Sequence, residues 1–252
     1  ADIQCKDVVV FGLRGSGQDP DPYTSYRDWE DGFGEENWAA YEAIKSFLDS
    51  RGKTVKAVGV RYPALEVFPN VLNLLNMTSG GMVGSAELGR DKLIQYIRDE
   101  AAQCGDQRVI ILGYSQGALA AHMALAEMHA AQDANLSRIA GVGFFADPAR
   151  FAGSQEMIWA NVDSNGVVEG PPSRLTASSG SYASAKGREL ALPPSLTSKV
   201  ISACFDKDPV CAIDPPTTPL VERLTWDIGS HSQYRYTVAP KLGETLAGKV
   251  VP

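Results

Sequence analysis

The stretch Gly113-Tyr114-Ser115-Gln116-Gly117 places a serine between two glycines, in the pattern G-x-S-x-G. Residues that favour β structure precede the serine, and a helical pattern begins directly after it. An ordinary glycine-rich turn is one interpretation. The alternative is a nucleophile elbow, in which the serine hydroxyl stands at the positive end of a helix and can attack an ester carbonyl. This placement predicts a nucleophile at Ser115, with the backbone N–H of Gln116 as an oxyanion donor.

A serine hydroxyl needs a base to remove its proton. The chain has three histidines, His122, His129 and His231. His122 and His129 fall on the helix that starts at Ser115, and His122 would lie about 10 Å along that helix. Both are therefore expected to be packing or surface residues. By elimination the base is His231, whose alternative role is that of a surface or capping histidine.

A carboxylate that orients the histidine is expected between the serine and the histidine in the chain. Asp147 closes one predicted strand, and Asp206 and Asp208 follow another. The latter two lie between Cys204 and Cys211, and a disulfide there would hold the carboxylate still. The residues favour this loop without deciding between its two acids. Asp147 is expected to be a turn or cap residue.

A second oxyanion donor is expected after the first predicted strand, where the phrase GLRGSG ends in a flexible turn. Ser16 offers both a hydroxyl and a backbone N–H at this point. Arg14 is expected to brace the loop. The glycines of GLRGSG do not fit a dinucleotide fingerprint.

Strand and helix patterns alternate along the chain, which is typical of a parallel sheet with helices on both faces. The predicted strands are Val8–Leu13, Val55–Tyr62, Val109–Gly113, Ile139–Ala146 and Lys199–Phe205. The predicted helices are Glu35–Ser50, Ser85–Gln103 and Gln116–Ala131, with a last one from near His231 to Leu246. We expect residues 1–252 to form one α/β domain around a mostly parallel five-stranded sheet.

The four cysteines allow three pairings. Cys5 and Cys104 precede two predicted strands, and if these strands are parallel neighbours the two residues lie side by side. Cys5–Cys104 and Cys204–Cys211 are then the disulfides. The cysteine spacing does not suit zinc. Disulfides persist mainly outside the reducing cytosol, which favours a secreted protein.

The net charge is −7 and the pI about 5.0, without a basic cluster, so no nucleic-acid partner is expected. The acidic run Asp19–Glu36 is expected to be a solvated loop. No apolar stretch is long enough to span a membrane. An opening Ala1 fits a mature protein whose signal peptide has been removed. No metal, nucleotide or flavin motif appears, and no cofactor is expected.

The phrases GLRGSG, GYSQGA, CFDKDPVC and HSQY, together with the two cysteine pairs, resemble the cutinase family of secreted serine esterases. The resemblance implies an α/β-hydrolase three-layer sandwich. It also implies Ser115 as nucleophile, His231 as base, Asp208 rather than Asp206 as acid, and Ser16 and Gln116 as the oxyanion hole. With its extra length at Phe151–Ser198, the chain is more similar to the actinobacterial cutinase-like esterases and lipases than to compact fungal cutinases.

The expected function is hydrolysis of carboxylic esters, namely cutin-like polyesters, medium-chain acyl esters or lipids, by a monomer. Two apolar stretches could form acyl-binding walls or could simply pack on the sheet. Their candidate residues are Phe68, Leu72, Leu75, Leu224 and Trp226. Alternatives are an acetylxylan esterase, a phospholipase or thioesterase acting on cell-envelope lipids, and a non-catalytic carbohydrate- or lipid-binding relative.

Overall fold

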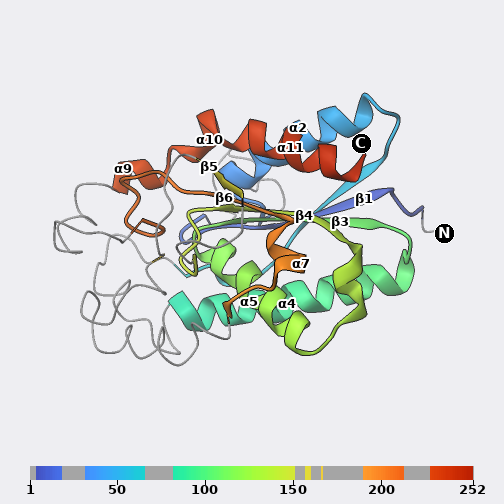
Figure 1. The fold of residues 1–252 in the computed structure, drawn as a ribbon, viewed down its shortest axis with the longest axis horizontal. Helices are drawn as coiled ribbons and strands as arrows, with labels where there is room; N and C mark the ends of the chain where they lie inside the picture. The colour runs from blue at the N-terminus through green and yellow to red at the C-terminus, as the bar shows by residue number, and fades with distance from the viewer. Residues whose placement is uncertain are drawn as a thin grey trace, which may run out of the picture.

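A parallel sheet of six strands, in the order β2-β1-β3-β4-β6-β5, forms the centre of the protein (Figure 1). The computed structural model describes residues 4–18, 32–65, 82–150, 157–159, 166, 190–212 and 228–251. The strands are β1 (Val8–Leu13), β2 (Val55–Gly59), β3 (Arg108–Tyr114), β4 (Ile139–Phe145), β5 (Met157–Trp159) and β6 (Val200–Ala203).

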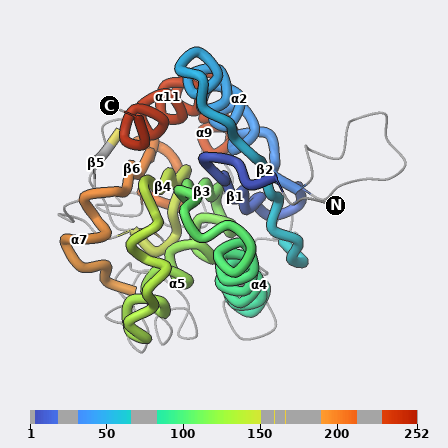
Figure 2. The backbone as a smooth tube through the Cα atoms, turned by 90° about the vertical axis from the view of Figure 1, so that its right-hand side faces the viewer, coloured from blue at the N-terminus to red at the C-terminus, as the bar shows by residue number. Residues whose placement is uncertain are grey.

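Helices cover both faces of this sheet. They are α2 (Glu35–Asp49), α4 (Met82–Gln103), α5 (Gln116–Ala130), α7 (Pro194–Thr197), α9 (Ile228–His231), α10 (Tyr234–Thr237) and α11 (Ala239–Val250), with the 3₁₀ helix η1 (Ala134–Arg138). Helices α4 and α5 pack together on one face, and α2 and α11 pack together on the other (Figure 2). The predicted three-layer α/β sandwich is confirmed.

Strand β1 shows why the strands read as continuous apolar runs. Val9 and Phe11 belong to the core on the side of α4 and α5, whereas Val8 and Val10 belong to the core on the side of α2 and α11. All four side chains are buried. Alternate residues of a strand point to opposite faces, so a sheet covered on both faces needs apolar residues at every position.

Two features of the fold differ from the sequence-based expectation. Strand β5 was not predicted, because three residues at a sheet edge are too few to give a periodic pattern. The predicted last helix is divided into α9, α10 and α11. Pro240 lies in the first turn of α11, where its missing N–H costs no hydrogen bond, and this favours a new helix start over a continuous helix.

The two disulfides have the predicted pairing. Cys5 is bonded to Cys104, and these residues precede β1 and β3, which are adjacent in the sheet. Cys204 is bonded to Cys211 and closes the loop that follows β6. Among the residues that the structure describes, no helix is long and apolar enough to cross a membrane.

Candidate active site

Ser115 occupies a sharp bend between β3, which ends at Tyr114, and α5, which begins at Gln116. Its backbone has φ 53° and ψ −117°, a conformation that costs free energy for any residue with a side chain. Its N–H donates to the carbonyl of Phe145 on the neighbouring strand, at 2.8 Å. The bend is thus tied to the sheet, and the serine has the strained conformation that a nucleophile elbow requires.

The two glycines of the G-x-S-x-G pattern are required by packing. A Cβ at Gly117 would lie 2.0 Å from the carbonyl oxygen of Leu13, and one at Gly113 would lie 2.7 Å from Cα of Ala118. Both contacts are with backbone atoms that cannot easily move away. The spacing of the motif therefore follows from how closely β3, α5 and the end of β1 approach each other.

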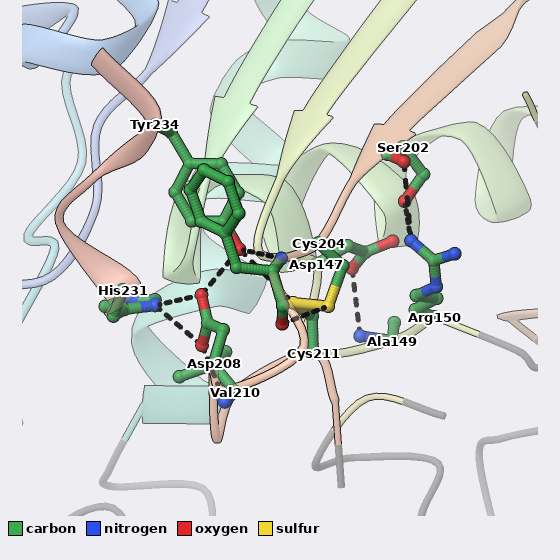
Figure 3. Close-up of a disulfide and its surroundings, with 11 residues drawn as sticks. Asp147, Ala149, Arg150, Ser202, Cys204, Asp208, Val210, Cys211, His231 and Tyr234 are labelled. Atoms are coloured by element: carbon green, nitrogen blue, oxygen red, sulfur yellow. Dashed lines mark hydrogen bonds and ion pairs between the residues drawn. A yellow bond between two sulfur atoms is a disulfide. The ribbon is translucent and has the colours of Figure 1, made fainter. Parts of the chain in front are cut away.

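His231 and Asp208 complete a hydrogen-bonded series with this serine. His231 Nε2 lies 2.9 Å from Ser115 Oγ, and its Nδ1 lies 3.0 and 3.1 Å from the two carboxylate oxygens of Asp208. All three side chains are buried. Figure 3 shows His231, from the end of α9, directed at Asp208 in the disulfide-closed loop. The structure therefore brings together the three residues predicted as nucleophile, base and acid.

Asp208 is held as a carboxylate by its surroundings. Burial alone would raise its pKa, but the charge and hydrogen bond of His231 and the donors on Tyr234 and Val210 outweigh burial, so the pKa lies below its ordinary value. An ionised carboxylate only accepts hydrogen bonds, so Nδ1 of His231 must carry a proton. In the neutral ring Nε2 then carries the lone pair that faces the Ser115 hydroxyl.

Tyr114 holds the histidine from the other side. Its ring stacks on the imidazole of His231, with centroids 5.0 Å apart, and its hydroxyl donates to the His231 carbonyl at 2.6 Å. The residue before Ser115 therefore fixes both the backbone and the ring of the histidine. Sequence reasoning assigned no role to Tyr114, because the hydroxyl-to-carbonyl contact joins residues 117 positions apart and leaves no local pattern.

The residues predicted for an oxyanion hole lie beside each other. The side-chain amide of Gln116 donates to Ser16 Oγ at 2.8 Å and to the carbonyl of Leu65 at 3.1 Å. Because the hydroxyl oxygen of Ser16 accepts this bond, its own proton can be directed at a substrate. The backbone N–H of Gln116 begins α5 and has no acceptor within the helix. The two predicted residues are thus in direct contact through the Gln116 side chain, which has a bracing role that the sequence did not reveal.

The loop after β1 that carries Ser16 is braced as expected. Arg14 donates from Nη2 to the carbonyl oxygens of Tyr62 at 2.6 Å and Pro63 at 3.4 Å. The Tyr62 hydroxyl donates back to the Arg14 carbonyl at 2.5 Å, and the N–H of Gly17 donates to Ala64. These reciprocal bonds fasten the loop to the segment that follows β2.

Glu36 contributes to the same loop, contrary to the expectation that it belongs to a solvated acidic run. Its side chain is buried and accepts a hydrogen bond of 2.6 Å from Gln18, whose own oxygen accepts the N–H of Gly15 at 2.8 Å. Burial raises the pKa of Glu36, while Gln18 and the charge of His231 lower it in part. Glu36 lies in the first turn of α2, so the expectation is wrong for this residue, while residues 19–31 of the run lie outside the described part of the chain.

A second histidine–aspartate pair lies elsewhere in the core. Nδ1 of His122 is 2.6 Å from the Asp147 carboxylate and its Nε2 is 2.7 Å from the Leu190 carbonyl. The carbonyl only accepts hydrogen bonds, so Nε2 donates to it, and Nδ1 faces the carboxylate, which leaves neither nitrogen directed at a serine hydroxyl. His122 is therefore a packing residue, as expected, and Asp147 also fills its expected turn role by accepting the N–H of Ala149.

The residues predicted to line an acyl-binding wall lie outside the described part of the chain. They are Phe68, Leu72, Leu75, Leu224 and Trp226. The described residues contain no cluster of histidine, cysteine and carboxylate side chains that could hold a metal ion.

Sequence relatives place these observations in a family. The profile of the Cutinase family matches residues 4–221. The chain is 30% identical over 146 residues to Cutinase CUT1 of Coprinopsis cinerea, covering 58% of this chain but only 59% of that protein. It is 23% identical over 207 residues to Carboxylesterase Culp1 of Mycobacterium tuberculosis, covering 82% of this chain and 69% of the relative.

Solved structures show the same fold. A cutinase-like protein from Cryptococcus sp. superposes with a TM-score of 0.60 at 18% identity, over 98% of this chain and 96% of the other. The catalytic core of the acetyl xylan esterase from Trichoderma reesei has a TM-score of 0.59 at 18% identity, over 97% and 98% of the two chains. With its profile match over most of its length, its serine at a strand-to-helix bend and its α/β sandwich, this chain belongs to the cutinase family of carboxylic ester hydrolases.

Proposed function

We propose that this protein is a secreted serine esterase that cleaves carboxylic esters through Ser115, His231 and Asp208. The observation that carries the proposal is the 2.9 Å contact between Ser115 Oγ and His231 Nε2, with Asp208 on the opposite nitrogen of the ring. This is the arrangement in which a neutral imidazole can take a hydroxyl proton while a carboxylate stabilises the resulting cation.

The reaction is acyl transfer to water in two stages. Ser115 Oγ attacks the ester carbonyl as its proton passes to His231 Nε2. The tetrahedral intermediate collapses, the bond to the leaving oxygen breaks, and His231 returns the proton to the departing alcohol. Water then attacks the acyl-enzyme with the same proton transfers and releases the carboxylic acid. The carboxylate of Asp208 accepts the hydrogen bond from the Nδ1–H of His231 throughout and does not itself become protonated.

The developing oxyanion is stabilised by the backbone N–H of Gln116 and by Ser16. Donors fixed in advance cost little reorganisation during the reaction, which is why they contribute strongly to the rate. The Gln116 side chain donates to Ser16 Oγ at 2.8 Å, and this bond supports a fixed orientation of the Ser16 hydroxyl, with its proton available for the oxyanion.

Ser16→Ala is expected to lower kcat about 10²-fold or more, because one oxyanion donor is lost. Hydrolysis of a soluble nitrophenyl ester measures the effect, and KM should change little. Ser232→Ala is a matched control, since Ser232 is exposed and bonds only within its own turn, to Gly229. A loss below about threefold for Ser16→Ala would make Ser16 a turn residue, with any contribution coming from its backbone alone.

The acyl group is proposed to be an aliphatic chain of medium length. Two apolar stretches of the sequence support this preference, as does Leu65, whose side chain is 46% exposed while its carbonyl accepts the Gln116 side chain of the oxyanion site. An apolar side chain exposed beside the reaction centre can contact the acyl chain of a substrate.

Nitrophenyl esters of increasing acyl length are expected to show kcat/KM values that rise from acetyl to a medium-length chain. The physical reason is that each buried methylene group adds binding free energy of about 0.8 kcal/mol. Triglyceride, phospholipid, cutin and acetylated xylan tested in parallel would separate a lipase, a phospholipase, a cutinase and an acetylxylan esterase. A clear maximum at acetyl, with release of acetate from xylan, would contradict the proposed chain length and favour the last of these.

Secretion is part of the proposal. It is supported by the two disulfides, which join Cys5 to Cys104 and Cys204 to Cys211, because such bonds persist mainly in oxidising compartments.

A further inference from the structure

Tyr234 connects the segment that carries the histidine to the loop that carries the acid. It begins α10, three residues after His231, and its side chain is fully buried. Figure 3 shows its ring lying over the loop that contains Asp208 and the Cys204–Cys211 disulfide. The ring stacks on Phe205 with centroids 4.4 Å apart. Its position is therefore fixed by packing as well as by hydrogen bonds.

The two shorter hydrogen bonds of the Tyr234 hydroxyl run in a defined direction, while Cys211 Sγ lies further away at 3.5 Å. The backbone N–H of Phe205 donates to the hydroxyl oxygen at 3.0 Å. The hydroxyl proton is therefore available for the carboxylate of Asp208, whose Oδ2 lies 2.7 Å away. Burial, followed by the negative charge of Asp208, raises the pKa of Tyr234 well above its ordinary value. The phenol thus remains a donor across the pH range in which an esterase works.

The Asp208 carboxylate has donors on both of its oxygens. The N–H of Val210 reaches Oδ1 at 2.9 Å, Tyr234 reaches Oδ2, and Nδ1 of His231 lies within 3.1 Å of each oxygen. Asp208 is fully buried, so water cannot replace a missing donor without a rearrangement. Tyr234 and Val210 together determine how the carboxylate plane is presented to the imidazole.

We propose that Tyr234 is a positioning residue for the esterase reaction, which fixes and stabilises the Asp208 carboxylate and through it the proton-accepting form of His231. The inference rests on the proposed function and extends it by a fourth side chain. Tyr234 does not touch the substrate. Its hydroxyl keeps the carboxylate aligned while the positive charge on His231 appears and disappears during each turnover.

Tyr234→Phe removes the hydroxyl and retains the ring. We expect kcat to fall about tenfold or more with KM within about threefold, because the carboxylate loses the hydroxyl that aligns it with the imidazole while substrate binding is untouched. Loss of the donor leaves the Asp208 charge less dispersed, so the imidazolium is stabilised and the acidic limb of the pH–rate profile moves to higher pH. Described charged or polar groups that bear on His231 include Ser115, Asp208, Tyr114 and Glu36.

Tyr236→Phe is the matched control. Tyr236 lies on the same helix, two residues further on, and its side chain is 71% exposed. The same chemical change there should leave kcat, KM and the pH profile as in the wild type. Thermal unfolding of both variants identifies the temperature range in which each is folded, and the kinetics are compared within that range.

A second substitution tests the inference without deleting the hydroxyl. Replacing Tyr234 with 3-fluorotyrosine keeps the ring and makes the phenol a stronger donor. The acidic limb should then move to lower pH, opposite to the shift in Tyr234→Phe. This variant also keeps the acceptor for the Phe205 N–H, so it provides the answer if the phenylalanine variant does not fold.

The outcomes separate the inference from the proposed function. A kcat loss in Tyr234→Phe with limb shifts of opposite sign in the two variants supports the inference. The inference is overturned if the wild type hydrolyses esters and Tyr234→Phe has the same kcat as Tyr236→Phe. It is also overturned if the acidic limbs of the pH–rate profiles do not move. The proposed function stays in place in both cases. Wild-type protein that hydrolyses no ester overturns both.

Discussion

Ser115→Ala is expected to lower kcat for ester hydrolysis by roughly 10⁴–10⁶-fold while the protein remains folded. The hydroxyl supplies the atom that becomes acylated, and no neighbouring group replaces it. His231 and the oxyanion donors remain in place, so the residual rate should exceed that in water. Kinetics with a soluble nitrophenyl ester, combined with thermal unfolding, measures both parts of the prediction.

Covalent labelling adds a test that does not depend on the choice of ester. An alkyl phosphonate should attach to Ser115 in the wild type and fail to attach in Ser115→Ala, and peptide mass spectrometry would identify the site. Ser232→Ala should label normally, because Ser232 is exposed and donates to a nearby carbonyl. Full ester turnover in Ser115→Ala would reject the assignment. Absence of labelling in an intact wild type would favour a non-catalytic binding relative.

Asp208→Asn should reduce kcat by about 10⁴-fold with little change in KM. The asparagine has nearly the same shape, but its amide can donate to Nδ1 of His231, which places the ring proton on Nε2. In that tautomer Nε2 has no lone pair for the Ser115 hydroxyl. The substitution also removes the negative charge that stabilises the imidazolium.

Asp206→Asn provides the control in the same loop. Asp206 is exposed, whereas Asp208 is fully buried and faces His231. The Asp206 variant is expected to keep wild-type kinetics, and its disulfide loop remains closed by Cys204 and Cys211. An Asp206 variant that loses activity as severely as Asp208→Asn would show that the loop matters as a whole and that neither acid has a distinct role.

Sequence patterns predicted the layers of this fold because the physics that forms them is local. Each of the five predicted strands overlaps an observed strand, and the central strands β1, β3 and β4 are mostly apolar because the sheet is covered on both faces. The bend at Ser115 could also be predicted from local sequence, because tight packing allows only glycine at positions 113 and 117 and so produces the G-x-S-x-G pattern. The divided C-terminal helix and the short strand β5 left no comparable periodic signal.

The parts of the candidate site that sequence reasoning missed depend on long-range contacts. Tyr114 bonds to the His231 carbonyl and Tyr234 to Asp208, yet nothing near either tyrosine indicates such a partner. The burial of Glu36 was missed because an acidic run suggests solvent, whereas the partner that accommodates its carboxyl is Gln18. Residues that supply chemistry have recognisable types and spacing, while residues that hold them in place are defined by the assembled fold.

The backbone angles at Ser115 have a consequence for how this protein can evolve or be engineered. Glycine adopts a positive φ at little cost, so the bend would have less backbone strain with glycine at position 115. Selection for heat resistance and selection for turnover therefore act in opposite directions at this position. Stabilising changes that leave turnover intact are expected away from the bend, in the helices that pack on the two faces of the sheet.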